Sequence, residues 1–121
     1  MSKIAIVDDE REILDILESF LSRRENFEID TYVNPELAVS SLISGKYDLI
    51  ITDIMMPQMD GVELLQKIKE KNKNQKVVMM TAYSTEDRLI ECDKIGADDY
   101  ITKPFISLRD VENKVLDILN M

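Results

Sequence analysis

The 121-residue chain contains no histidine, no tryptophan and a single cysteine. Without histidine it lacks the commonest metal ligand and general base, and one cysteine cannot form an intrachain disulfide or a cysteine-based zinc site. Any metal must therefore be held by oxygen, which favours a hard cation such as magnesium or calcium. The 24 acidic residues outnumber the 15 basic ones, and the resulting net charge of −9 argues against a direct nucleic-acid partner.

Long apolar runs are missing as well. No segment approaches the length of a membrane span, and only four apolar residues follow Ser2-Lys3 before two aspartates, so nothing resembles a signal peptide. We therefore expect no membrane insertion and a cytoplasmic location. No repeat or linker divides the chain, and its length suffices to bury a core, which indicates a single domain over residues 1–121.

Five short segments are typical of β-strands. Two of them are more polar and belong at the edges of a sheet, namely residues 27–33, which alternate, and residues 98–102. The other three are continuous apolar or β-branched runs, as in strands buried on both faces. Each of these three ends at a polar side chain: residues 4–7 before Asp8, 49–52 before Asp53, and 77–80 before Thr81.

Helical patterns separate these strands. Apolar residues recur at helical spacing in each of five segments, and capping signals mark several of their ends. The first two segments are residues 9–24, with a possible capping box at Asp9 and Glu12, and 34–45, with Asn34 as N-cap and Gly45 at the end. The third follows Gly61 and runs up to a polar loop over residues 71–75. The last two are a helix capped by Ser84 that runs to Gly96 and a final helix from Ser107 almost to the terminus.

Alternating strands and helices predict a doubly wound α/β fold, in which helices cover both faces of a parallel sheet. Placing the three apolar strands inside gives the flavodoxin-like order 2-1-3-4-5, whose switch point lies between the first and third strands. Asp8, Asp9 and Asp53 then face each other across a gap set by the strand spacing of about 4.8 Å. Thr81 and Lys103 follow the fourth and fifth strands at the same edge.

These residues resemble those of the response-regulator receiver family of two-component signalling, over the whole chain and in the family's usual order. The resemblance implies that Asp53 accepts a phosphoryl group from a histidine kinase or phosphotransfer protein. It also implies a signalling domain, here a stand-alone one, rather than an enzyme with another substrate. The matching motifs are Asp8-Asp9, Asp53 with Met56-Pro57 and Asp60-Gly61, Met80-Thr81-Ala82, Gly96 to Tyr100, and Lys103-Pro104-Phe105.

The resemblance further implies that Mg²⁺ is held by Asp9, Asp53 and the backbone carbonyl of Met55, with Asp8 acting mostly through water. Three carboxylates with one Mg²⁺ and one lysine sum to zero charge, so cations stand ready for an incoming phosphoryl group. Because Mg²⁺ keeps several of its waters, we expect a shallow and exposed site.

In the family, Thr81 and Lys103 each contact a phosphoryl oxygen, and the peptide bond before Pro104 is cis. Tyr100 is implied to turn inward when Thr81 moves toward the phosphoryl group. The resulting surface change is expected around the fourth helix, fifth strand and fifth helix, where a downstream protein would bind. The chain itself is expected to be a monomer or a weak dimer.

Simpler interpretations exist for each residue. Asp8 and Asp9 could merely cap a helix, Thr81 could be a strand-end residue, and Lys103 could be a surface lysine. Cys92 is predicted to be a packing residue rather than a reactive thiol.

Met55 and Tyr83 occupy positions that vary in the family beside the acyl phosphate. Both are bulky and largely apolar, so we hypothesise that they restrict the attacking water and lengthen the phosphorylated state.

Three other functions remain open. A small phosphohydrolase with an aspartate nucleophile commonly carries a second acid two residues later, where this chain has Met55. The chain could also be the receiver portion of a longer transcriptional regulator, or an inactive scaffold of the same fold.

Overall fold

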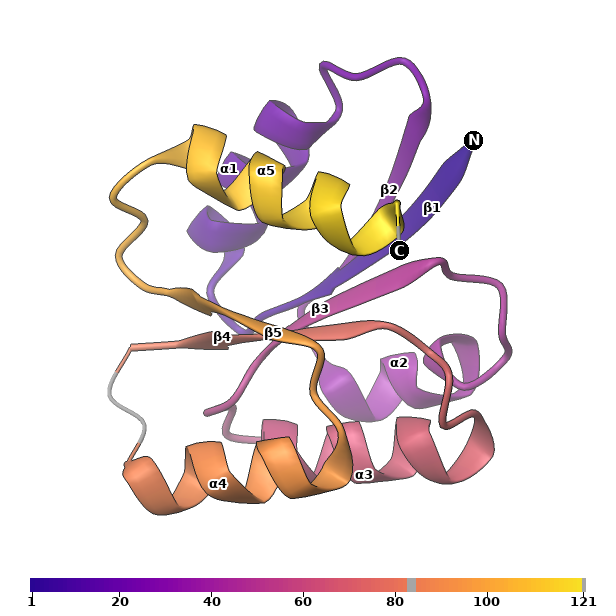
Figure 1. Ribbon diagram of the computed structural model, residues 1–121, viewed down its shortest axis with the longest axis vertical. Coiled ribbons are helices and arrows are strands. Elements are labelled where there is room, and N and C mark those ends of the chain that lie inside the picture. The colour runs from indigo at the N-terminus through magenta and orange to yellow at the C-terminus, as the bar shows by residue number, and fades with distance from the viewer. Residues whose placement is uncertain (83–84, 121) are drawn as a thin grey trace.

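The computed structural model describes residues 1–82 and 85–120 and contains one sheet of five parallel strands, in the order β2-β1-β3-β4-β5 (Figure 1). The strands are β1 (Ser2–Val7), β2 (Phe27–Tyr32), β3 (Leu49–Asp53), β4 (Val77–Thr81) and β5 (Asp99–Thr102). The helices are α1 (Arg11–Leu21), α2 (Pro35–Leu42), α3 (Gly61–Lys71), α4 (Glu86–Ile95) and α5 (Leu108–Leu119). The predicted fold class and strand order are confirmed.

Helices cover both faces of the sheet, with α1 and α5 on one face and α2, α3 and α4 on the other (Figure 1). Successive residues of a strand point to opposite faces, so each buried strand supplies both cores. In β1, Ile4 and Ile6 pack with α1 and α5, whereas Ala5 and Val7 pack with α2 and α3. Burial on both sides explains why the central strands are apolar without alternation.

The register of the strands brings their carboxyl ends to one edge. Val7 pairs with Thr52, and Asp53 pairs with Met80 on the next strand. Thr81 in turn pairs with Thr102 of β5. The residues that follow β1 and β5, together with the last residues of β3 and β4, therefore share this edge, as in other open α/β sheets.

The first helix begins later than predicted, and the proposed capping box is wrong. Glu10 occupies the N-cap position of α1, with no hydrogen bond from its side chain to the helix, and Asp9 lies before it. Asp8 and Glu10 instead make contacts at the sheet edge, which local sequence spacing does not reveal. The end of the helix is also earlier, at Leu21 rather than Arg24.

Other boundaries differ by a few residues. The N-cap of α4 is Thr85, whose hydroxyl accepts a hydrogen bond from the Arg88 backbone N–H, and the predicted cap Ser84 lies outside the described residues. Helix α2 begins after Asn34 as predicted but ends at Leu42, and Gly45 follows in a turn with φ of 85°. Strand β2 ends one residue before Val33, which is exposed.

Within residues 1–82 and 85–120, no helix is both long and apolar enough to cross a membrane.

Candidate functional site

Asp53 is the last residue of β3, a strand whose five residues are all buried. Only 6% of Asp53 is exposed, so its carboxylate lies inside the sheet edge rather than on a shallow surface. The following loop folds back tightly, since the Gly61 N–H donates to the Ile54 carbonyl at 2.7 Å. A Cβ at Gly61 would lie 2.1 Å from the Asp53 carbonyl oxygen, which explains why glycine stands there.

Asp8 follows β1 and is fully buried. Its Oδ1 accepts a hydrogen bond from the Glu10 backbone N–H at 2.8 Å, which fixes the carboxylate. Its own backbone N–H donates to the Tyr32 carbonyl at 3.1 Å, so Asp8 continues the pairing of β1 with β2. Asp8 is therefore held by the sheet, and it does not cap α1, whose N-cap position is Glu10.

Lys103 lies directly after β5 and reaches across the edge of the sheet. Its Nζ donates to Asp8 Oδ2 at 2.9 Å and to Asp53 Oδ2 at 3.0 Å, and it lies 3.4 Å from Glu10 Oε1. The backbone N–H of Lys103 donates to the Thr81 carbonyl at 2.8 Å. The peptide bond to Pro104 is cis, as expected. Lys103 is 8% exposed, so the interpretation as a surface lysine is wrong.

Burial dominates the electrostatics of this cluster. It raises the pKa of Asp53 above its ordinary value, opposed by the hydrogen bond from Lys103, while the negative charge of Asp9 raises it further. It raises the pKa of Asp8 in the same way, opposed by the Glu10 N–H and by Lys103. For Lys103, burial lowers the pKa, but the hydrogen bonds to Asp8 and Asp53 outweigh it and the pKa is raised.

Oxygen atoms of Asp8, Glu10 and Asp53 all lie within 4.8 Å of one another. All of these donors are carboxylates, the ligands that hard cations prefer, and their three negative charges exceed the single positive charge of Lys103. The residues present therefore fit a divalent cation such as Mg²⁺. Asp9, predicted as a ligand, is not among the three, although its charge acts on Asp53.

Sequence reasoning missed Glu10. Its position could have suggested a role in the site, because Glu10 directly follows the acid pair Asp8-Asp9. Its side chain was expected to belong to the following helix, and only the position of Lys103 shows that it faces the cluster.

The chain matches a known protein family over most of its length. Residues 4–115 match the family model of the response regulator receiver domain. The chain belongs to the response-regulator receiver family. It is thus a signalling domain of two-component systems.

The relatives of this receiver include the transcriptional regulatory protein ResD of Bacillus subtilis (strain 168), which is 41% identical over 118 residues. That match covers 98% of this chain and 48% of ResD. The regulatory protein VanR of Enterococcus faecium is 43% identical over 103 residues, covering 85% of this chain and 44% of VanR. The chain therefore spans about half the length of these curated relatives.

Solved structures agree closely with the fold of this receiver. A receiver domain protein from Methanospirillum hungatei JF-1 has a TM-score of 0.92 at 30% identity, covering 99% of this chain and 94% of that one. The response regulator TrrA from Thermotoga maritima, crystallised in complex with Mg²⁺-BeF, has a TM-score of 0.84 at 37% identity, covering 98% of this chain and 99% of that one.

The two residues expected to act as a switch lie on neighbouring strands of the receiver. Thr81 ends β4 and is partly buried. Tyr100 lies in β5 and packs against the core beneath α4, where its hydroxyl donates to the Leu89 carbonyl at 3.3 Å and to the Asp93 carboxylate. Burial and then the Asp93 carboxylate raise the pKa of Tyr100. In this structure Tyr100 is therefore tied to α4.

Met55 lies two residues after Asp53 with 57% of its surface exposed. Its backbone N–H donates to Asp53 Oδ1 at 3.4 Å, so the residue remains beside the carboxylate while its side chain faces solvent. Tyr83, the other residue proposed to shield the site, lies outside the described residues. Cys92 is fully buried, as a packing residue should be.

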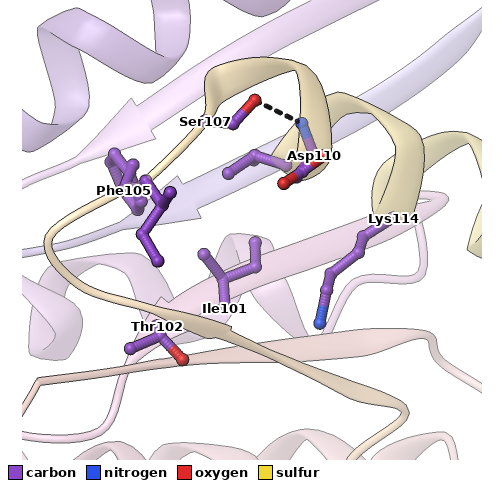
Figure 2. Close-up of a pocket in the computed structure, with 8 residues that line it drawn as sticks. Ile101, Thr102, Phe105, Ser107, Asp110 and Lys114 are labelled. Carbon is purple, nitrogen blue, oxygen red and sulfur yellow. Dashed lines mark hydrogen bonds between the residues drawn. The ribbon is translucent and has the colours of Figure 1, made fainter.

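A pocket of about 150 Å³ lies between β5 and the first turns of α5 (Figure 2). Ser107 caps α5 there, because its hydroxyl accepts a hydrogen bond from the Asp110 N–H at 3.3 Å. On the far side, Lys114 Nζ donates to the Tyr100 carbonyl at 2.6 Å and lies 3.4 Å from Asp99 Oδ1. These contacts attach α5 directly to the strand that carries Tyr100.

Proposed function

We propose that this receiver accepts a phosphoryl group on Asp53 from the phosphohistidine of a histidine kinase or phosphotransfer protein. The observation that carries the proposal is the contact of Asp53 Oδ2 with Lys103 Nζ at 3.0 Å, at a buried strand end beside Asp8. An Asp53 oxygen attacks phosphorus in line, the new O–P bond forms, and the N–P bond of the donor breaks with its electron pair returning to the imidazole. The donor must be another molecule, since this chain has no histidine.

Phosphoryl transfer depends mainly on positioning and on cations that neutralise charge on the transferring oxygens. Lys103 is one such cation, and its ammonium is already held at the attacking carboxylate. Thr81 ends the strand adjacent to Asp53 and would offer its hydroxyl to another phosphoryl oxygen. Thr81 ends β4 and Lys103 directly follows β5, its neighbour in the sheet, so the two side chains start from the same edge.

Mg²⁺ would be held by Asp9, Asp53 and the Met55 carbonyl, with Asp8 acting mostly through water. The carboxylates of Asp8, Glu10 and Asp53 support a cation at this edge, because they carry more negative charge than Lys103 balances. When bound, the ion supplies positive charge to the transferring phosphoryl oxygens. The complex of the related TrrA with Mg²⁺-BeF supports the same chemistry here.

The output we propose is a surface change on the face formed by α4, β5 and α5, to which a downstream protein binds. The hydroxyl of Tyr100 bonds to α4 and its backbone to α5, so rotation of this side chain would loosen α4 from β5. Phosphorylation would bias two arrangements of this face by population shift. The receiver would work as a monomer or weak dimer.

A second form of this function is a receiver within a longer transcriptional regulator. It is favoured by the curated relatives, which are named as transcriptional or regulatory proteins and are about twice as long as the matched region. In that case, the same face would act on an attached output domain.

The test is labelling with acetyl phosphate in the presence of Mg²⁺. We expect mass spectrometry to find one acid-stable, base-labile phosphoryl group on the wild type, none on Asp53→Asn, and none when EDTA removes Mg²⁺. Asp15→Asn changes an exposed acid of α1 and is the matched control that should label normally. Labelling of Asp53→Asn, or steady turnover of a generic phosphate ester, would contradict the proposal.

A further inference from the structure

Glu10 stands at the N-cap of α1, yet its side chain makes no capping hydrogen bond. The short side chains of Asp, Asn, Ser and Thr at this position usually accept a bond from the second or third helical N–H, whereas glutamate is not among the preferred caps. Here Asn34, Asp60, Thr85 and Ser107 all do so at their own helices. The Glu10 carboxylate instead lies 3.4 Å from Lys103 Nζ, so it serves the sheet edge rather than the helix.

The three partners of Lys103 differ in their burial. The side chains of Asp8 and Asp53 are 0% and 8% exposed, whereas that of Glu10 is 63% exposed. The two buried acids thus hold the ammonium from within, and Glu10 holds it from the solvent side. A phosphoryl donor must approach from solvent, which is the side that Glu10 occupies.

A divalent cation bound to Asp53, with Asp8 acting through a water of the ion, would compete with the lysine, because the Oδ2 atoms of both acids now accept hydrogen bonds from Lys103. Two cations cannot share those oxygens without strong repulsion. The ammonium would then have to turn away from them. Of the three carboxylates that contact Lys103, Glu10 is then the one still able to accept a hydrogen bond from the ammonium. This contact lies at the mouth of the site, which is the solvent side of the cluster.

We propose that Glu10 is a positioning residue for Lys103, an inference that rests on the proposed phosphoryl transfer. Glu10 keeps the lysine ammonium at the mouth of the site when a cation takes the two buried acids, so that the ammonium stays within reach of the phosphoryl oxygens. Its charge also strengthens cation binding.

The size of the second effect follows from Coulomb's law. The Glu10 oxygen lies within 4.8 Å of those of Asp8 and Asp53. One unit charge about 5 Å from a divalent cation, in a dielectric close to that of water and at about 0.15 M salt, changes a binding constant roughly fivefold. A charge about twice as far away changes it less than about twofold under the same screening.

The experiment compares Glu10→Gln with Glu12→Gln, an exposed acid in the first turn of the same helix that has no ion pair among the described residues. Proteins carrying ¹⁵N-lysine are titrated with Mg²⁺ while the ammonium signal of Lys103 is followed by NMR, with Lys103→Arg used for its assignment. The Mg²⁺ dissociation constant is measured in the same titration.

We expect the wild type and Glu12→Gln to keep a protected Lys103 ammonium signal at saturating Mg²⁺. Glu10→Gln should shift this signal before Mg²⁺ is added, lose it to exchange with water at saturation, and bind Mg²⁺ about fivefold more weakly. A Glu10→Gln protein whose Lys103 signal matches the wild type throughout would overturn the proposal. Equal loss of Mg²⁺ affinity in both variants would also overturn it, since the effect would then be one of net charge.

These outcomes are separate from those of the proposed function. Glu12→Gln lies outside the carboxylate cluster and should still take the acetyl phosphate label at saturating Mg²⁺. If the wild type takes no label, the proposed function fails whatever the Lys103 signal does. If the wild type is labelled but its Lys103 signal is insensitive to Glu10, only the positioning role fails.

Discussion

The substitution Lys103→Met tests most directly whether the Lys103 ammonium stabilises the two buried carboxylates of the site. Methionine keeps an unbranched side chain of similar length but removes the charge, so Asp8 and Asp53 are left buried without their counter-ion. Removing one partner of a buried ion pair typically costs about 3–5 kcal/mol of unfolding free energy. We expect about 3 kcal/mol here, because both acids can relieve part of the cost by taking up a proton.

The assay is urea denaturation in EDTA at pH 7, followed by circular dichroism. With a slope of about 1.5 kcal/mol per molar urea, a loss of 3 kcal/mol lowers the midpoint by about 2 M. Lys67→Met, an exposed lysine of α3, is the matched control and should leave the midpoint nearly unchanged. A Lys103→Met midpoint within about 0.5 M of the wild type would refute the reasoning.

The pH dependence of the unfolding free energy provides a second test of the loss predicted for Lys103→Met. Burial raises the folded-state pKa of Asp8 and of Asp53 above the ordinary value of 3.8. The stability linked to these acids is therefore fully present below pH 3.8 and lost as pH rises through their elevated folded-state pKa values. Without the Lys103 ammonium, the folded-state pKa values of Asp8 and Asp53 rise further, because Lys103 lowers both. The deficit of Lys103→Met should thus shrink when the pH falls from 7 toward 5, and Mg²⁺ should stabilise this variant more than the wild type.

Three further changes probe the surroundings of the site. Met55→Asn should shorten the lifetime of the phosphorylated form on the order of tenfold, a barrier change of about 1.4 kcal/mol, because the exposed apolar side chain no longer hinders water. Gly61→Ala should cost about 3 kcal/mol in urea denaturation and reduce labelling, since its Cβ would overlap the Asp53 carbonyl. Tyr47→Phe removes the hydroxyl that donates to Asp30 at 2.6 Å and should cost about 1 kcal/mol without changing labelling.

Each of these three predictions has an outcome that would contradict it. An unchanged dephosphorylation rate in Met55→Asn would remove the shielding role. Gly45→Ala is the control for Gly61→Ala: its φ of 85° makes alanine strained, but no atom lies within 4 Å, so labelling should persist. Equal loss of labelling in both would show that the tight contact with Asp53 is irrelevant. A labelling defect in Tyr47→Phe would show that the contact of Tyr47 with Asp30 affects more than stability.

Much of the fold followed from local patterns. Runs such as residues 4–7 and 77–80 are too apolar for a surface strand and too short for a helix, and a parallel sheet with short connections allows few strand orders. Once the order is known, the strand ends must meet at one edge, and this placed Asp8, Asp53, Thr81 and Lys103 together. Helix caps were less predictable, because several polar residues near each helix start could have served, as Thr85 rather than Ser84 illustrates.

What the sequence by itself determined was therefore the set of elements, their order, and the edge at which the acids, the hydroxyl and the lysine gather. Only the tertiary structure decided which of these side chains touch. Lys103 and Asp8 lie 95 residues apart in the chain, and their contact depends on how β5 packs against its neighbours. Whether Asp9 or Glu10 faces the cluster depends on the backbone turn between β1 and α1. The depth of the site depends on the loop that closes over Asp53 at Gly61.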